Sequence, residues 1–213
     1  MKIGILGTGP VGTALGTGFI KTGHQVMLGA RSADNANAAA WKAENGADAS
    51  SGTFADAAAF GELVVVAVKG DALAAAIGAA GVGNFAGKTV IDTVNPLDFS
   101  KGYPDLSIKG NDSAGETLQR LLPGAHVVKA FNTVTSSLMF RPDLPGGPPD
   151  MMIAGDDADA KAAVTAILAD FGWPTIDLGN LYAARWLEAF VMTWVLACQA
   201  RGDWRQAFKL LHA

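Results

Sequence analysis

Three glycines near the N-terminus have the spacing of a loop that binds a diphosphate. Residues 7–12 follow a short apolar run and open a helical pattern, so the G-x-G-x-x-G motif has its usual context. The first glycine permits a tight turn, the second lets the backbone approach a pyrophosphate, and the third allows close helix–strand packing. The alternative is a glycine-rich turn with no ligand. The loop residues are Gly7, Thr8, Gly9, Pro10, Val11 and Gly12.

The end of the second apolar run indicates which dinucleotide is bound. An acidic residue there would bind the ribose 2′-hydroxyl of NAD, but the run ends Gly29-Ala30-Arg31-Ser32. A guanidinium matches phosphate geometry and keeps its charge. One charge-assisted hydrogen bond, about 1.5–3 kcal/mol net, would favour NADP over NAD by ~10- to 150-fold. We therefore predict an NADP site at Arg31 and Ser32, the alternative being that Arg31 is a solvated surface residue.

Three further strand ends are expected to line the same crevice, because ligands bind beyond the carboxyl ends of strands in open α/β sheets. Asn95 and Asn132 are candidates to orient a nicotinamide carboxamide or a second ring, and Lys69 to meet a phosphate or an acidic tail. The alternative is that they are loop residues with local hydrogen bonds. The residues at these ends are Val68, Lys69, Asn95, Pro96, Ala130, Phe131 and Asn132.

Short β-branched runs alternate with alanine-rich helical stretches, which predicts βαβ units. We expect an α/β fold: a Rossmann-type, doubly wound, mostly parallel sheet with helices on both faces and a short C-terminal helical extension. A weaker strand is expected within 47–53, short or at an edge. The expected strands are 2–6, 25–28, 63–68, 89–92, 126–129, 151–154 and 175–178, and the helices are 11–22, 33–45, 71–80, 113–122 and 158–171.

Residues 1–178 are predicted to form the NADP-binding domain and 179–213 a helical extension, with helices near 181–200 and 203–211. The first of these helices has an apolar stripe that either packs on the sheet's own flank or forms a homodimer contact. Arg141–Asp150 contains four prolines and is expected to be a surface loop that helps exclude water from the site. The stripe consists of Trp186, Leu187, Phe190, Val191, Trp194, Val195 and Cys198.

Composition excludes several classes of protein. The chain has 213 residues, a net charge of −4, one cysteine and three histidines, His24, His126 and His212. An acidic chain is a poor partner for nucleic acid or an anionic membrane. One cysteine leaves no disulfide framework or cysteine-rich metal site, and three scattered histidines form no ligand cluster. No targeting segment opens the chain, and the longest apolar stretch, 190–198, is far shorter than a membrane span of about 20 residues. We expect a cytoplasmic protein.

Several segments in this order resemble the coenzyme F420-dependent NADP oxidoreductase family, and also the nucleotide-binding domain of the STEAP metalloreductases. The resemblance covers nearly the whole chain. Ala30 replaces a serine of the F420-using enzymes, and the sequence 132–135 is closer to the STEAP type, whose acceptor is a flavin. The segments are 7–12, 29–32, 127–133, 155–157 and 207–211.

The resemblance implies hydride transfer between NADPH and a deazaflavin (F420) or flavin (FMN or FAD) ring. It implies that residues 8–11 hold the pyrophosphate, Arg31 and Ser32 the 2′-phosphate, and the later strand ends the nicotinamide and its partner ring. Ring-to-ring transfer needs orientation more than an acid or base, and His24 and His126 begin strands at the far end of the sheet. The alternatives are a reductase of small carbonyl or imine substrates and a non-catalytic NADPH sensor.

Overall fold

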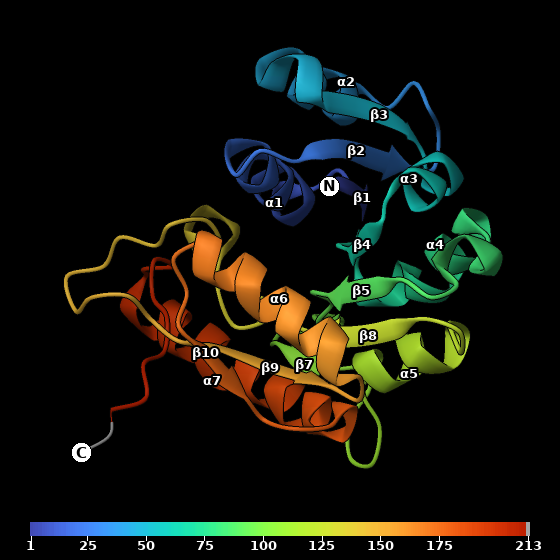
Figure 1. The fold of residues 1–213 in the computed structure, drawn as a ribbon. Coiled ribbons are helices and arrows are strands. Elements are labelled where there is room, and N and C mark those ends of the chain that lie inside the picture. Colours follow the sequence, from blue (N-terminus) through green and yellow to red (C-terminus); the bar gives the residue numbers. More distant parts are fainter. Residues whose placement is uncertain (212–213) are drawn as a thin grey trace.

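The computed structural model describes residues 1–211, so His212 lies outside the described part. Eight strands form one sheet in the order β10-β9-β8-β5-β4-β1-β2-β3, with helices on both faces (Figure 1). Strands β1 to β5 and β8 run parallel, β9 is antiparallel to β8, and β10 is parallel to β9. The Rossmann-type expectation is confirmed. The strands are β1 Lys2–Leu6, β2 Gln25–Ala30, β3 Ala49–Thr53, β4 Leu63–Val66, β5 Thr89–Asp92, β8 His126–Lys129, β9 Met151–Gly155 and β10 Thr175–Asp177.

The chain adds β2 and β3 on one side of β1 and then returns to add β4 and β5 on the other side. The point between β1 and β4 is therefore the switch point, where this fold opens a crevice. The weak strand predicted near residue 50 is β3, and it lies at the sheet edge as expected. Its polar sequence, Ala-Ser-Ser-Gly-Thr, is tolerated there because an edge strand has only one paired neighbour.

Two apolar clusters cover the two faces of the sheet, one built with α1 and α6 and the other with α3, α4 and α5. Helix α7 adds smaller clusters, including contacts with β9. The helices predicted within residues 11–200 are present with ends shifted by a few residues. The helices are α1 Pro10–Lys21, α2 Ala36–Asn45, α3 Phe54–Phe60, α4 Leu73–Ala80, α5 Ala114–Leu121, α6 Ala158–Asp170 and α7 Ala184–Arg201.

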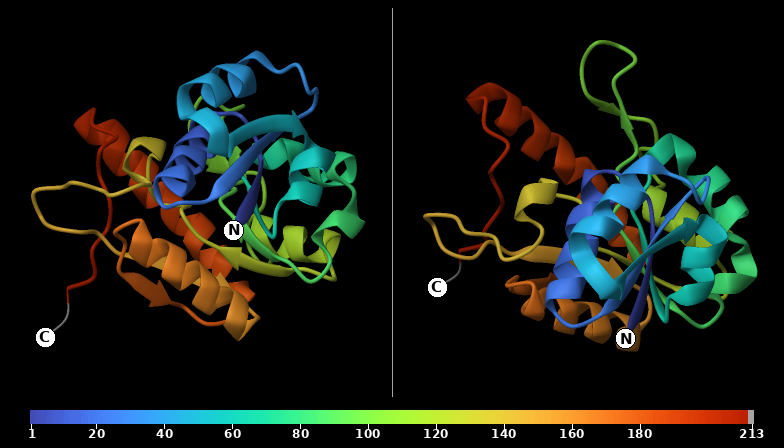
Figure 2. Two further views of the ribbon diagram at one scale, coloured as in Figure 1. Left: turned by 45° about the horizontal axis from the view of Figure 1, so that its top comes forward. Right: turned by 90° about the horizontal axis from the view of Figure 1, so that it is seen from above.

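One helix and one hairpin were not predicted. Helix α3 has only seven residues and begins with a capping box between Thr53 and Asp56. Two-residue strands β6 Leu97–Asp98 and β7 Asp105–Leu106 pair as a hairpin between β5 and α5. This hairpin projects from the sheet as the green loop in the right-hand view of Figure 2.

The predicted helix at 203–211 is wrong, because these residues run without helical structure. Contacts distant in sequence hold them instead: Trp194 Nε1 donates to the Gln206 carbonyl at 2.8 Å, and the rings of Phe190 and Phe208 stack. The Phe208 carbonyl also accepts from Asp150 N–H at 2.9 Å. The proline-rich segment 141–150 is irregular, as expected, and packs against this C-terminal tail.

The apolar stripe of α7 is divided between the core and the surface. Most of it faces inward, which confirms packing on the protein's own flank, but Trp186 is 65% exposed. Residues Leu181–Arg201 form a helix whose length and composition would allow it to cross a membrane, with a mean hydropathy of 1.2. That stretch is longer than the apolar run considered in the sequence, and 50% of its most apolar 18-residue window is buried in the fold. The buried stripe residues are Leu187, Val191, Trp194, Val195 and Cys198.

Candidate functional site

The glycine loop joins β1 to α1 in the geometry that its spacing predicts. Gly7 has φ 129°, a left-handed value that favours glycine, and its N–H donates to the Gly29 carbonyl at 3.0 Å. A Cβ on Gly12 would stand 2.2 Å from the Gly7 carbonyl oxygen, so this position must stay bare. Around Gly9, by contrast, no atom lies within 4 Å of where a Cβ would stand.

The N-terminus of α1 is open to a ligand. Gly9 is its N-cap residue and Pro10 its first residue, and within residues 1–211 no side chain caps this end. A proline at this position sacrifices no helical hydrogen bond. The unpaired N–H groups and the positive end of the helix dipole form a site for an anion.

A pocket of about 590 Å³ brings six of the predicted residues together: Gly7, Thr8, Gly9, Arg31, Val68 and Lys69. They come from the ends of β1, β2 and β4, as the crevice rule predicts. Among the described residues Arg31 has no ion-pair partner. An exposed guanidinium without a protein carboxylate is available to a phosphate.

The sequence reading missed the other walls of this pocket. Phe54 begins α3, and small residues of α4 complete the lining. The α4 sequence Leu-Ala-Ala-Ala-Ile-Gly-Ala-Ala could have indicated this wall, because the small side chains of an alanine-rich helix face leave space for a ligand beside the sheet. The additional lining residues are Phe54, Ala67, Asp71, Ala72, Ala75, Ala76 and Ala79.

A second pocket of about 440 Å³ adjoins the first, since Lys69 and Asp71 line both. Asn95 and the hairpin residues Asp98 and Phe99 form its other walls. Phe99 is 56% exposed, which leaves an aromatic face beside the pocket. An aromatic side chain next to a polar floor suits a flat ring with polar edges.

Asn95 and Asn132, predicted together, are hydrogen-bonded to each other. Asn95 Nδ2 donates to the Asn132 carbonyl at 2.7 Å, and Asn132 Nδ2 donates to Asn95 Oδ1 at 3.2 Å and to the Leu187 carbonyl at 2.8 Å. Asn132 Oδ1 is buried with no partner in the described chain. A buried acceptor without a partner is costly, which is typical of a site that a ligand or water completes.

Asn132, which is 2% exposed, and the remaining predicted residues do not line either pocket. Ala130 and Phe131 are buried in the core below the crevice, and Pro96 is buried behind Asn95. Phe131 has φ 60°, a strained value for a non-glycine residue, and it turns the chain toward Asn132. Val11 and Gly12 lie within the first turn of α1, and Ser32 is exposed next to Arg31.

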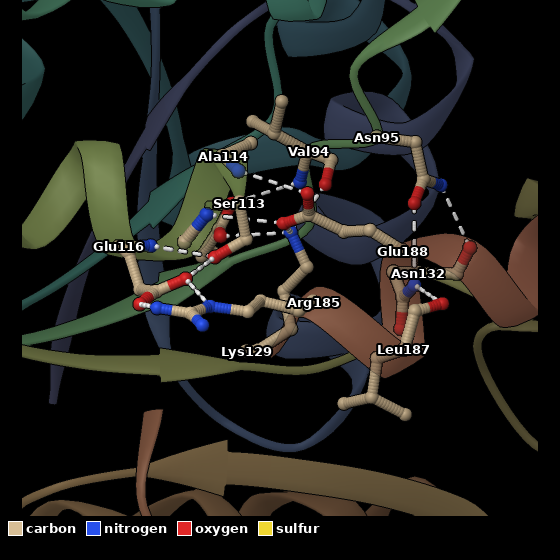
Figure 3. Close-up of polar contacts among 12 residues, drawn as sticks. Val94, Asn95, Ser113, Ala114, Glu116, Lys129, Asn132, Arg185, Leu187 and Glu188 are labelled. Carbon is tan, nitrogen blue, oxygen red and sulfur yellow. Dashed lines mark hydrogen bonds and ion pairs between the residues drawn. The ribbon is translucent and has the colours of Figure 1, made fainter. Parts of the chain in front are cut away.

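A buried ion cluster at the same edge of the sheet was also missed. Lys129, Asp92 and Glu188 come from β8, β5 and α7 and are almost completely buried (Figure 3). Burial raises the pKa of Glu188 despite the opposing effect of Lys129. The sequence signal was Lys129 at the end of an apolar strand and Glu188 within the apolar stripe of α7. A charge at such a position is buried and requires a partner.

Comparisons with known proteins agree on one family. The model for NADP oxidoreductase, coenzyme F420-dependent, matches residues 2–96. The F420-dependent NADP reductase of Methanothermobacter marburgensis is 32% identical over 203 residues, and the match covers 88% of each protein. Metalloreductase STEAP3 of Rattus norvegicus is 30% identical over 193 residues, but this chain spans only 36% of its length.

Two solved structures show the same fold, and one of them also supports the family. A protein from Arthrobacter sp. FB24, provisionally assigned as an F420-dependent NADP reductase, has a TM-score of 0.94 and 39% identity, with 100% of both chains covered. A reductive aminase from Aspergillus terreus in complex with NADPH has a TM-score of 0.68 at 23% identity, covering 94% of this chain and 62% of that one. At that identity the likeness is one of fold.

Proposed function

The chain belongs to the coenzyme F420-dependent NADP oxidoreductase family, and on that premise we propose that it transfers a hydride between NADPH and a flavin-like or deazaflavin ring. Membership makes it an NADP-dependent oxidoreductase. The acceptor ring (F420, FMN or FAD) is the part that we propose. The observation that supports it is the pair of adjoining pockets, one at the glycine loop and one at Asn95.

The residues of the first pocket fit a phosphorylated dinucleotide. The bare backbone at Gly9 and the uncapped start of α1 would hold the diphosphate, and Arg31 with Ser32 the 2′-phosphate. Bound NADPH would supply the hydride. Phe54 and the alanines of α4 provide an apolar wall on the adenine side.

The second pocket is our proposed site for the acceptor ring. Lys69 and Asn95 border it, and Phe99 offers a face for stacking. The unpartnered oxygen of Asn132 is the acceptor that we propose for a carboxamide N–H of the nicotinamide. These groups bind and orient two rings, and such orientation is what direct hydride transfer requires.

Turnover tests this assignment. NADPH oxidation is measured with F420, FMN, FAD and ferric chelates as acceptors, and with small carbonyl and imine substrates as the alternative. We expect turnover with a ring acceptor and NADPH binding at least tenfold tighter than NADH binding. Tight NADPH binding without turnover on any acceptor would identify a sensor instead.

We also propose a homodimer through the exposed side of α7 and a cytoplasmic location. Trp186 and Leu196 on α7 are 65% and 54% exposed, and Tyr182, in the short 3-10 helix just before α7, is 53% exposed. Large exposed apolar side chains on one helix face are typical of a subunit contact.

A further inference from the structure

A fully buried lysine connects three segments, one of which carries Asn95 into the second pocket. Lys129, at the end of β8, has no exposed surface. Its ammonium donates to Asp92 Oδ2 at 2.9 Å, to Glu188 Oε1 at 2.6 Å and to the Val94 carbonyl (Figure 3). An ammonium has three N–H donors, so all of them are used. Burial alone would lower the pKa of Lys129, but the two carboxylates raise it and keep the group charged.

The first segment is the bend after β5. The Val94 N–H donates to Asp92 Oδ1 at 2.9 Å, while the Val94 carbonyl accepts from Lys129. The N–H and the carbonyl of Val94 are therefore each hydrogen-bonded to a buried charged side chain. The next residue, Asn95, lines the second pocket, so this clamp sets the direction in which its side chain leaves the bend.

The second and third segments are α5 and α7. The Glu188 carboxylate accepts from the N–H groups of Ala114 and Gly115 at 2.8 and 3.0 Å, at the start of α5. The residue before it, Leu187, presents its carbonyl to Asn132 Nδ2. The contact between Lys129 and Glu188 therefore also determines where the acceptor for Asn132 lies.

We propose that Lys129 is a positioning residue, whose buried ammonium aligns Asn95 and Asn132 so that their amides orient the nicotinamide ring. This inference rests on the proposed function. A structural role alone explains the cluster poorly, because apolar residues of equal volume stabilise a core as well as buried ion pairs do. The contacts of an ammonium are directional. Asn95 follows Val94, whose carbonyl accepts from Lys129, and Asn132 donates to the carbonyl of Leu187, which precedes Glu188.

The test uses two variants. Lys129→Met removes the ammonium and leaves two buried carboxylates without a countercharge, and this variant can fail to fold. Lys129→Met combined with Asp92→Asn keeps the net charge of the cluster. It also preserves an acceptor for the Val94 N–H, and Glu188 keeps its two N–H donors on α5. The double variant is therefore the decisive one, after its melting confirms a folded protein.

Three measurements separate alignment of the ring from general damage. Adenosine 2′,5′-bisphosphate occupies the first pocket without a nicotinamide, and its dissociation constant is expected to stay within about twofold of wild type. The fluorescence anisotropy of bound NADPH, which reports how firmly the dihydronicotinamide is held, should fall. The kcat with the best ring acceptor should fall at least tenfold, as misplacement by about 1 Å can cost 100-fold.

Lys88→Met is the matched control, because Lys88 also donates from its ammonium to a carbonyl, that of Ala58 at 2.8 Å, but before β5 at the opposite edge. It should leave all three measurements unchanged. Wild-type kcat and anisotropy in the folded double variant would overturn the positioning role, as would equal weakening of NADPH and the bisphosphate. A wild-type protein that does not bind NADPH would instead overturn the proposed function, and this inference with it.

Discussion

The hydroxyl of Ser32, the residue after Arg31, donates a hydrogen bond to the carboxylate of Asp34. This hydrogen bond, with further help from the Asp34 backbone, lowers the pKa of Asp34, so the group is an anion at neutral pH. A phosphate held by Arg31 and Ser32 would compete for that hydroxyl and meet a like charge. The proposed 2′-phosphate site thus contains a group that would oppose its ligand.

Asp34→Asn is therefore expected to tighten NADPH binding by roughly two- to fivefold at low salt, with the gain shrinking as salt screens the charge. NADH binding, which lacks the phosphate, should not change. Titration at two salt concentrations checks this. Asp48→Asn is the control, since Asp48 lies before β3 at the opposite edge. Unchanged or weaker NADPH binding in Asp34→Asn would contradict this account of the site.

Gly9 and Gly12 should respond differently to alanine. A Cβ on Gly9 meets no protein atom within 4 Å, so Gly9→Ala should fold, with a helix-cap cost below about 1 kcal/mol. It should weaken NADPH binding at least tenfold, because the methyl group occupies the space of the diphosphate. Gly12→Ala should instead destabilise the fold by about 1–3 kcal/mol or more, through its clash with Gly7. Melting curves and titrations check both, and NADPH binding unaffected by Gly9→Ala would exclude this loop as the site.

Glu116 and Arg185 join α5 to α7 and should contribute acid-sensitive stability. Arg185 donates twice to the Glu116 carboxylate, at 2.8 and 2.6 Å, and holds the pKa of Glu116 below its usual value. A lowered folded-state pKa stabilises the protein above the unfolded pKa, near 4.5, and this stability is lost as pH falls through the folded value. Glu116→Gln should melt lower at pH 7 and show a shallower fall in Tm toward pH 3. Glu44→Gln, on exposed α2, is the control, and an unchanged slope in Glu116→Gln would contradict the role of the pair.

The dimer proposal predicts a concentration-dependent assembly that depends on the exposed side of α7. Wild-type protein should sediment as a dimer at micromolar concentration. Trp186→Glu should sediment as a monomer with little change in melting temperature, because its side chain is 65% exposed within one chain. A monomeric wild type would remove the proposal.

The sheet could be predicted well because most of its strands are continuous apolar runs. Leu63–Val66 is buried along its whole length, as a central parallel strand must be. Helix α3 was missed because seven residues carry too little periodicity, and its start depends on one capping box. The segment 203–211 was wrongly predicted as a helix because its extended course is set by distant contacts such as Phe190–Phe208.

The site residues likewise divide into those that local sequence predicts and those whose contacts come from distant segments. The glycine loop and Arg31 follow local rules for a single strand end, and the structure places them in one pocket. The partners of Lys129 could not be read locally, since Asp92 lies 37 positions and Glu188 59 positions away in the chain. The open amide oxygen of Asn132 likewise results from packing among three segments.

The central claim is that Arg31 and the glycine loop together bind a phosphorylated adenine ribose and its diphosphate. Titration of Arg31→Ala with NADPH and with NADH tests it most directly, with Arg31→Lys as the variant that keeps the charge but loses the forked geometry. We predict that Arg31→Ala raises the dissociation constant for NADPH at least tenfold and leaves that for NADH unchanged, with Arg31→Lys in between. Equal losses for the two nucleotides, or a wild type that prefers NADH, would contradict the account.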